Sequence, residues 1–385
     1  MITKKPTRSG EVRYEVRLRG PDGKERSRTF RTKKEAERHE RNHHAAIDSG
    51  TWIDPRAGRV TLEAWATEWQ RTVVHLRPKT RRSYESNLRN HILPLLGEYE
   101  LAKLTPSQLR AWMSDLTVKK GRGGKSLAPA TVAQAYRTLN RVLGAAVDDE
   151  LIGRNPLGGV KPPQVQPTPM RFLTHEELAL LAEKTDERYR ALVLVAGYTG
   201  LRAGELMALR RHHVDLLRRT ISITEQVQHI GGQFVVSAPK SAAGRRSVSM
   251  PRLVAEALDA HLRALEDQSV DALVFPAPEG GYLVAQNFRK RVWLPAVKTA
   301  GLAPLRLHDL RHTCASLAIA AGADVKVLQR MLGHASAALT LDRYGHLMPG
   351  QAESVAERLD QMARAAGTAP LGSVEPIDRT GSSAT

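Results

Sequence analysis

The chain has 385 residues, enough for two or three domains of ordinary size, each with a hydrophobic core of its own. Its 58 lysines and arginines exceed its 40 acidic residues and give a formal charge of +18, which predicts a polyanionic partner but leaves DNA, RNA and a membrane surface open. The single cysteine, Cys314, excludes an internal disulfide, and no apolar run reaches the roughly 18 residues that a membrane-spanning helix needs. The first residues, MITKKPTRSG, are charged and lack the apolar core of a signal peptide, so we expect a cytoplasmic protein with no membrane partner.

The N-terminal segment predicts a small basic module. Residues 11–19 alternate apolar and charged side chains, which predicts a half-buried strand. GPDG at 20–23 is a turn signal, KERSRTF predicts the returning strand, and a charged helix is expected at 33–48. The polar face of this sheet either meets only solvent or contacts DNA.

Residues 60–160 carry a helical period and predict a second, helical domain. Thr105 to Gln108 form a capping box with proline at the first helical position. GRGGKS at 121–126 predicts a loop, and a second long helix follows it. The stretch 155–170 holds five prolines and no periodic pattern, so we expect an extended linker, placed at 161–170.

The remainder of the chain predicts a larger mixed domain at 171–365. It opens with a capping box from Thr174 to Glu177, and helical patterns dominate it. Residues 220–250 change character: ISITEQV, FVVSAPK and RRSVSM, separated by glycine-containing turns, predict a three-stranded antiparallel patch. The small, polar residues 366–385 predict a disordered tail. Together these patterns predict a mainly α fold with small β-sheets, of the α+β class.

Two segments of this domain place basic residues at marked positions. TGLRAGEL puts Arg202 three residues before Glu205 at a glycine-marked helix start, so the acid can orient the guanidinium, although such a pair is most often only solvated. APKSAAGRR puts Lys240 beside a turn between two strands, where a lysine ordinarily serves solubility. Neither segment alone indicates chemistry.

A third segment, LHDLRHT, brings His308 and Arg311 onto one face of a helix. His308 and His312 are four residues apart, as in helical zinc sites. However, Asp309 stands where the glutamate of an H-E-x-x-H motif would be, and no third ligand is evident. We therefore expect no metal at this segment.

The fourth segment, LGHASAALTLDRYGHL, places His334 and Tyr344 ten positions apart. A tyrosine ordinarily packs and hydrogen-bonds, but this one lies between Arg343 and Gly345, a poor setting for a core side chain. Metal-free cleavage of a phosphodiester requires a nucleophile, charge stabilisation on the non-bridging oxygens and a proton for the leaving oxygen. The tyrosine, arginines, histidines and lysine of the four segments can supply each role.

Taken in order, these segments resemble the tyrosine recombinase family, the phage-type integrases and site-specific recombinases. TGLRAGEL, HDLRHT and LGHASAALTLDRYGHL carry the resemblance, which is strong over about 170–350. It is looser over 61–160, where AAVDDELIGRNPL resembles the end of the family's core-binding domain, and the first 50 residues resemble a small three-stranded arm-binding module. The resemblance implies an arm-type DNA-binding module (β-β-β-α) at 1–55, a helical core-binding domain at 60–160 and a catalytic domain at 171–365.

The resemblance also implies a role for each residue. Tyr344 would attack the scissile phosphate, forming a 3′-phosphotyrosyl bond and releasing a 5′-hydroxyl. Arg202 and Arg311 would grip the non-bridging oxygens. Lys240 would protonate the leaving oxygen, and His308 would assist proton transfer from the tyrosine. Because the bond energy stays in the phosphotyrosine, strand exchange is implied to need no ATP, metal or other cofactor.

Two supporting residues and an assembly complete what the resemblance implies. His334 would hydrogen-bond the phosphate, and Glu205 would support Arg202. After Lys240 this chain has SAAG where the family more often has threonine and a polar turn, so this position departs most from the pattern. Four subunits would act on two double-stranded DNA attachment sites through a Holliday junction, and accessory DNA-bending proteins are further candidate partners. A helix at 351–365 would dock on a neighbouring subunit or on its own domain.

Two other functions are consistent with parts of the pattern. A protein that kept the fold but only binds DNA has no use for Tyr344 and Lys240 together. A type IB topoisomerase or a resolvase would use the same chemistry with another outcome. The separate N-terminal module favours an integrase, because recombination uses more than one DNA site per subunit. We therefore predict an integrase that integrates or excises a mobile element.

Overall fold

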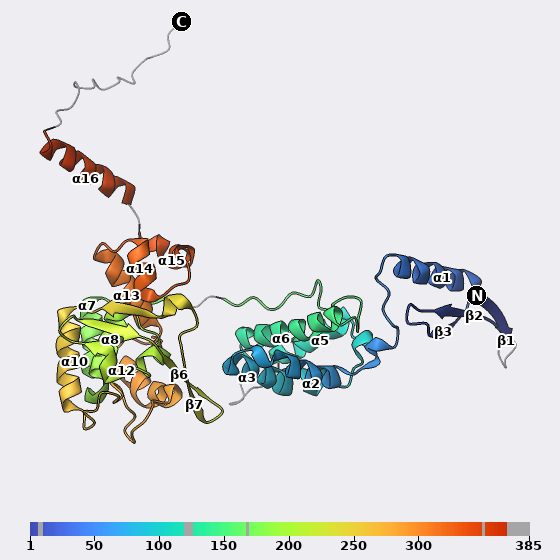
Figure 1. The fold of residues 1–385 in the computed structure, drawn as a ribbon, viewed down its shortest axis with the longest axis horizontal. Coiled ribbons are helices and arrows are strands. Elements are labelled where there is room, and N and C mark those ends of the chain that lie inside the picture. Colours follow the sequence, from blue (N-terminus) through green and yellow to red (C-terminus); the bar gives the residue numbers. More distant parts are fainter. Residues whose placement is uncertain (7–10, 119–125, 167–168, 349–350, 368–385) are drawn as a thin grey trace, which may run out of the picture. The chain divides into compact units, whose positions relative to one another are not determined.

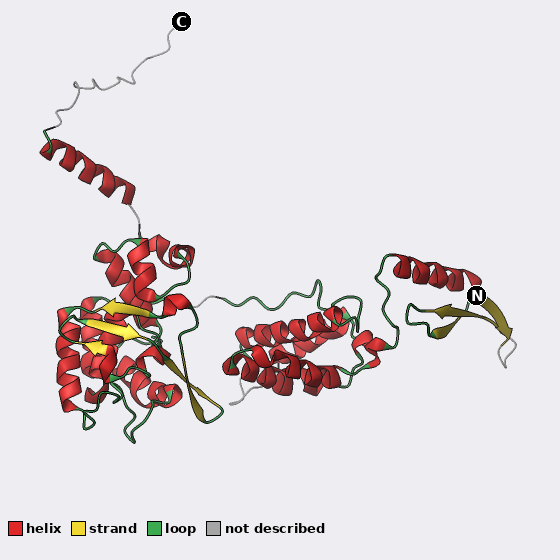
Figure 2. Ribbon diagram, in the orientation of Figure 1, coloured by secondary structure: helices red, strands yellow, loops and turns green. Residues whose placement is uncertain are grey.

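A computed structural model describes residues 1–6, 11–118, 126–166, 169–348 and 351–367 (Figure 1). The chain divides into two compact units, Met1–Thr168 and Pro169–Thr385. Helices predominate in both, and the strands are few and short (Figure 2). The loop predicted at 121–126, except for its last residue, and the predicted tail beyond residue 367 lie outside the described residues. Within the described ranges, no helix has the length and apolar character to cross a membrane.

The first unit begins with a three-stranded antiparallel sheet of order β1-β2-β3, followed by a helix. These elements are β1 (Ile2–Pro6), β2 (Val12–Arg19), β3 (Glu25–Phe30) and α1 (Lys33–Asp48). The strand predicted at β2 is confirmed, and its alternation holds over the second half, where Val16 and Leu18 are buried with Ala36 of α1 while Arg17 and Arg19 are exposed. At its start the alternation fails, since Val12 is 40% exposed. No pattern in the residues pointed to β1, because a short strand rich in lysine shows no alternation; only the family resemblance implied a third strand.

The rest of the first unit is a helical bundle around a buried apolar core. Its helices are α2 (Leu62–Thr72), α3 (Pro78–Asn87), α4 (Leu93–Leu96), α5 (Pro106–Val118) and α6 (Pro129–Asp148). The buried indole of Trp65 in α2 donates to the carbonyl of Val142 in α6 at 2.9 Å. The predicted capping box is confirmed: the Thr105 amide donates to Gln108 Oε1 at 2.8 Å, and the Gln108 amide donates to Thr105 Oγ1 at 3.3 Å.

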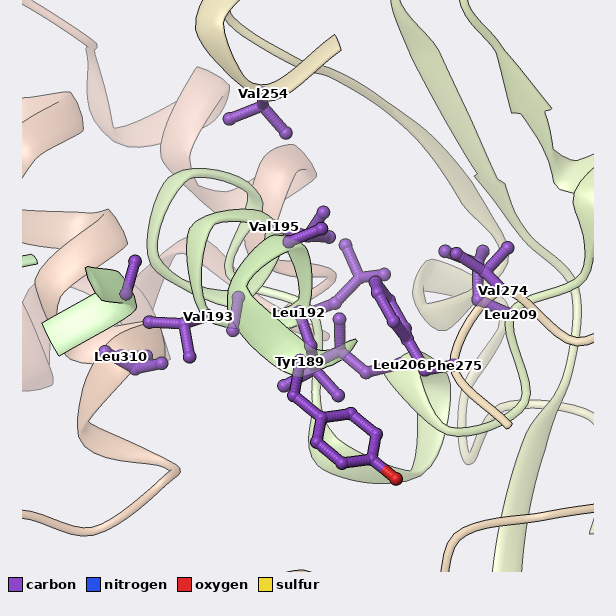
Figure 3. Close-up of a cluster of buried hydrophobic side chains, with 14 of the residues drawn as sticks. Tyr189, Leu192, Val193, Val195, Leu206, Leu209, Val254, Val274, Phe275 and Leu310 are labelled. Atoms are coloured by element: carbon purple, nitrogen blue, oxygen red, sulfur yellow. The ribbon is translucent and has the colours of Figure 1, made fainter. Parts of the chain in front are cut away.

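The second unit is built around the helix α8 (Glu187–Thr199), which packs against α7, α10 and α13. The other helices are α7 (His175–Lys184), α9 (Ala203–Leu206), α10 (Arg252–Ala264), α11 (Ala285–Phe288), α12 (Leu294–Thr299), α13 (Asp309–Ala320), α14 (Val325–Leu332), α15 (Ala337–Tyr344) and α16 (Gln351–Ala365). Val193 of α8 and Leu310 of α13 lie close together in the core (Figure 3). This contact fixes the start of α13, which carries Arg311.

The strands of the second unit correct the predicted three-stranded patch. They form two sheets: one has the order β4-β5-β8, and the other is the hairpin β6-β7. Their bounds are β4 (Val214–Asp215), β5 (Thr220–Ile223), β6 (Gln226–Ile230), β7 (Gln233–Ser237) and β8 (Arg246–Ser249). The predicted first strand breaks at Thr224 and Glu225, because their side chains bond back to His213 at 2.8 Å and Arg210 at 3.1 Å. RRSVSM therefore pairs with β5 and not with FVVSAPK.

The last helix, α16, presents an apolar stripe. Val355, Leu359 and Met362 are 51%, 61% and 69% exposed, and every other described side chain of α16 is exposed as well.

Candidate active site

Arg202 stands at the amino end of α9, where the sequence predicted a glycine-marked helix start. Gly200 ends α8 in the left-handed conformation, with φ of 65°, and turns the chain into α9. Glu205, one turn later, accepts from the Arg202 amide at 2.9 Å and from Nη1 at 2.8 Å. The carboxylate therefore orients the guanidinium, as the spacing predicted.

Glu205 also holds a second arginine, Arg246, which sequence reasoning missed. The carboxylate is 2% exposed, and Arg246 Nη2 lies 3.0 Å from its Oε2. Burial alone would raise the pKa of Glu205, but the hydrogen bond and charge of Arg246, together with those of Arg202, hold this pKa below its ordinary value. The only signal for Arg246 in the sequence is its place beside Arg245 at the start of a predicted strand. The Arg246 guanidinium holds the Glu205 carboxylate in place, and the carboxylate in turn orients Arg202.

Arg311 is 3% exposed and lies in the first turn of α13. Its Nη1 donates to the carbonyl of Gly200 at 2.6 Å and its Nη2 donates to the carbonyl of Leu332. Burial, followed by the charges of Arg202 and Arg246, lowers its pKa to about 9, which still leaves the guanidinium charged at pH 7. Arg202 Nη2 donates to the next carbonyl, that of Gly333, at 3.2 Å. The two predicted arginines thus meet at the end of α14.

His334 follows directly on this meeting point. It is 4% exposed, and its Nδ1 lies 2.9 Å from Oγ1 of Thr340. Burial, and then the charges of Arg311 and Arg202, lower the pKa of this imidazole to about 4. His334 is therefore neutral at pH 7 and can donate a hydrogen bond from Nε2 only if Nδ1 accepts from the threonine.

Gly333 sets the turn that carries His334. Its φ is +63°, and a Cβ there would lie 2.8 Å from the carbonyl oxygen of Ala243, in the loop that follows Lys240. The close approach joins that loop to the end of α14. The turn therefore needs glycine for both its conformation and its packing.

We expect Gly333→Ala to lower the free energy of unfolding by more than the about 1–2 kcal/mol that a left-handed alanine costs, because the backbone of Ala243 must also move. Gly322→Ala is the matched control: Gly322 has φ of +87°, and a Cβ there would meet nothing within 4 Å. Urea unfolding of both variants checks this. Equal losses would contradict the packing argument.

Tyr344, the last residue of α15, is 0% exposed. Its ring packs with Ala315, Leu328 and Leu332. The hydroxyl lies 2.8 Å from Nδ1 of His312, and the ring is parallel to that of His334, with centroids 6.4 Å apart. Tyr344 is thus a packed aromatic, and the expectation that its position between Arg343 and Gly345 is a poor setting for a core side chain was wrong. Its hydroxyl nevertheless belongs to the polar cluster.

His312 is the second residue that sequence reasoning missed. Its spacing from His308 was used only to weigh a zinc site, whereas here its Nδ1 contacts the tyrosine. His308 immediately precedes α13, is exposed, and stands edge-on to His312 with ring centroids 5.1 Å apart. The residue is exposed as a whole, but partial desolvation of its ring, followed by the nearby charges of His312 and Arg311, lowers the pKa of His308. No group of three or more metal-ligating side chains occurs in the part of the chain that the structure describes.

Lys240 lies in the loop between β7 and β8, and its side chain is exposed. The loop is anchored beyond it, where the carbonyl of Gly244 accepts from Arg246 Nη1 at 3.0 Å. The predicted position of Lys240, beside a turn between two strands, is confirmed. The cluster itself brings together Arg202, Arg311, His334 and Tyr344.

The cluster is positively charged and mostly shielded from water, and it lies next to the hydroxyl of Tyr344. Two guanidinium groups, those of Arg202 and Arg246, pair with the Glu205 carboxylate, and a third, that of Arg311, is held by backbone carbonyls alone. The cluster therefore keeps a positive excess that suits an anion. The arginines are held by backbone carbonyls and Glu205, so little reorganisation is needed when charge develops nearby. Such an arrangement can stabilise negative charge on a phosphate that the hydroxyl attacks.

Family models match both units of the chain. Residues 171–350 match the phage integrase family, and residues 61–117 match the phage integrase N-terminal SAM-like domain. The putative prophage phiRv2 integrase of Mycobacterium tuberculosis is 31% identical over 361 residues, which cover 91% of this chain and 93% of that protein. The integrase of Mycobacterium phage L5 is 29% identical and covers 87% of this chain and 90% of its own.

Solved structures show the same fold. The Tn1549 transposon integrase in complex with a circular intermediate DNA has a TM-score of 0.65 at 22% identity, covering 78% of this chain and 99% of that one. A lambda integrase dimer bound to a COC′ core site has a TM-score of 0.57 at 19% identity, covering 88% and 93%. With the relatives that span both units, these findings establish that the chain belongs to the phage integrase family of tyrosine recombinases.

Proposed function

We propose that this protein is a site-specific integrase that cuts and rejoins double-stranded DNA through Tyr344 and so moves a mobile element into or out of a larger DNA. The observation that carries the proposal is the convergence at residues 332–334. There the guanidinium groups of Arg202 and Arg311 meet consecutive carbonyls, beside a buried imidazole whose ring is parallel to that of Tyr344.

In the proposed reaction, the hydroxyl oxygen of Tyr344 attacks the scissile phosphorus. The bond from phosphorus to the 5′ oxygen breaks as the bond to the tyrosine forms, which leaves a 3′-phosphotyrosyl bond and a 5′-hydroxyl end. Arg202 and Arg311 hold the two non-bridging oxygens, because a planar, charged guanidinium matches their geometry. A 5′-hydroxyl from a second DNA reverses the step and rejoins the strands.

The remaining predicted residues take supporting roles in this proposal. His334 donates a hydrogen bond to the phosphate from Nε2. Its ring is neutral, and when Nδ1 accepts from the Thr340 hydroxyl the proton of the ring is on Nε2. Lys240 gives a proton to the departing 5′ oxygen when its exposed loop reaches DNA. His308 assists proton transfer near the tyrosine, and Glu205 keeps Arg202 in place. No step in this scheme calls for a cofactor.

The proposed partner is duplex DNA carrying attachment sites, and the working assembly is a homotetramer. A lambda integrase tetramer is known on a Holliday junction, and it shares this fold at a TM-score of 0.53. We propose that residues 1–55 bind arm-type sites, that residues 60–160 bind core sites, and that the exposed stripe of α16 docks on a neighbouring subunit. The protein would act in the cytoplasm, with DNA-bending proteins as accessory partners.

The proposal is tested with nicked duplexes tiled across the DNA that flanks the protein's own gene. A nick just 3′ of the cleavage position lets the short product diffuse away and traps the covalent intermediate. We expect an SDS-resistant protein–DNA band in the presence of EDTA at one position of the series. Binding without any covalent band, on this series and on a genomic library, would favour a protein that only binds DNA.

DNA affinity is expected to fall steeply with salt. With six to ten phosphates neutralised, counterion release predicts a loss of about 10³ to 10⁵ in affinity between about 50 and about 200 mM salt. The net charge of +18 makes such an interface available. Fluorescence anisotropy at several salt concentrations measures the slope, and an affinity that does not change with salt would contradict a phosphate-dominated interface.

A further inference from the structure

The hydroxyl of Tyr344 has a single hydrogen-bond partner within the described part of the chain, and that partner is His312. Nδ1 of His312 lies 2.8 Å from the phenolic oxygen. The tyrosine is 0% exposed and His312 is 5% exposed, so bulk water reaches neither group. A buried hydroxyl can give up its proton only to a group that touches it, which here is the imidazole.

We propose that His312 is the catalytic base that takes the proton from Tyr344 as its oxygen attacks the scissile phosphorus, an inference that rests on the proposed function. In this step the O–H bond of the tyrosine breaks, and its proton passes to Nδ1 of His312. The phenolic oxygen forms the bond to phosphorus, and the 5′ oxygen leaves with a proton from Lys240. On rejoining, His312 returns its proton to the tyrosine.

The geometry favours His312 as the base over His308, the histidine that the family resemblance implies for proton transfer. His308 is exposed at the start of α13, and its contact is with the ring of His312 at 5.1 Å and an interplanar angle of 81°. His312 lies one helical turn further along α13, and there its side chain contacts Tyr344, the last residue of α15. The three rings therefore form a row in which His312 is the middle member and alone touches the hydroxyl.

The charges around His312 suit a neutral proton acceptor. It is faced by His308, Asp309 and Arg311 of its own segment, by Arg306 before it, and by Arg343 and Tyr344 of α15. Burial is the largest influence and lowers the pKa of His312; Asp309 opposes it, and the three arginines add to it. The imidazole is thus neutral at pH 7, as a base must be before the reaction.

The test compares three variants in single-turnover cleavage of the nicked duplex that gives the covalent band. In His312→Asn, the amide reaches the place of Nδ1 and keeps a hydrogen bond to the tyrosine but cannot take a proton. His312→Ala removes both functions. We expect His312→Asn to cleave about 10² to 10⁴ times more slowly than the wild type, the usual contribution of a general base. His346→Asn, two residues beyond the nucleophile and exposed, is the matched control and should cleave at the wild-type rate.

The pH profile separates a base from a residue that only holds the tyrosine. The wild-type rate should be nearly flat above about pH 7, because His312 is already neutral there. The His312→Asn rate should rise about tenfold per pH unit, because the tyrosine must then lose its proton to hydroxide. A substrate with sulfur in place of the 5′ bridging oxygen should speed up a Lys240→Ala variant but not His312→Asn, since sulfur removes only the need to protonate the leaving group.

Each result decides the matter. If His312→Asn cleaves as fast as the wild type, faster than it, or with the same flat profile, His312 is not the base and the inference is overturned. In that case the wild-type adduct still stands and the proposed function is untouched. If the wild-type protein itself forms no adduct on any DNA that it binds, the proposed function fails first. Circular dichroism of both variants at the assay temperature confirms that they are folded.

Discussion

Tyr344→Phe is expected to abolish the covalent protein–DNA adduct while leaving DNA affinity unchanged. The variant removes one oxygen atom, the proposed nucleophile, and keeps the ring that packs with Ala315, Leu328 and Leu332. We expect DNA affinity to come from many phosphate contacts of basic side chains, so the loss of one buried hydroxyl should leave it unchanged. An SDS gel of the nicked-duplex reaction and an anisotropy titration measure the two quantities side by side.

The structural effect of this variant is expected to be small but measurable. Phenylalanine leaves Nδ1 of His312 without its partner in a buried setting, which costs about 1–3 kcal/mol of stability. The loss of the adduct should therefore be complete at temperatures where the variant remains folded. An adduct that persists in Tyr344→Phe would mean that another residue is the nucleophile, and mass spectrometry of the linked peptide would identify it.

Local signals predicted much of the fold. The capping boxes at Thr105 and Thr174 are decided within a few residues and are confirmed, and the alternation of β2 is confirmed over its second half. The break between β5 and β6 could not be predicted, because it depends on contacts of Thr224 and Glu225 with His213 and Arg210. A strand propensity says nothing of such distant partners.

The candidate site shows the same division. Arg202 and Glu205 are one turn apart, so their pairing follows from spacing alone. The contact of His312 with Tyr344 joins residues 32 positions apart, and no local pattern distinguishes a histidine that touches this tyrosine from a zinc ligand. Arg246 was missed for the same reason, since its partner Glu205 lies on another element, 41 residues away. Motifs identify residues near the chemistry, whereas tertiary contacts assign their partners.

Arg202→Ala and Arg311→Ala are each expected to slow cleavage by about 10² or more, the effect of losing one preorganised donor to a developing charge. The two variants should differ in stability. Arg311 is 3% exposed and bonded to the carbonyls of Gly200 and Leu332, so its loss leaves buried acceptors unpaired at a cost of about 1–3 kcal/mol. Arg202 has a side chain that is 37% exposed, and water can replace part of its bonding.

The conservative variant Arg311→Lys separates catalysis from folding. A lysine keeps the positive charge but cannot donate from a planar fork to two acceptors, so cleavage should stay far below the wild-type rate. Arg343, exposed and next to Tyr344, provides the matched control, and Arg343→Ala should retain most of the activity. Single-turnover rates and urea midpoints for the four variants provide the comparison. If Arg311→Lys cleaved at the wild-type rate, Arg311 would contribute only its charge, and the argument that its two carbonyl contacts preorganise it for the transition state would be wrong.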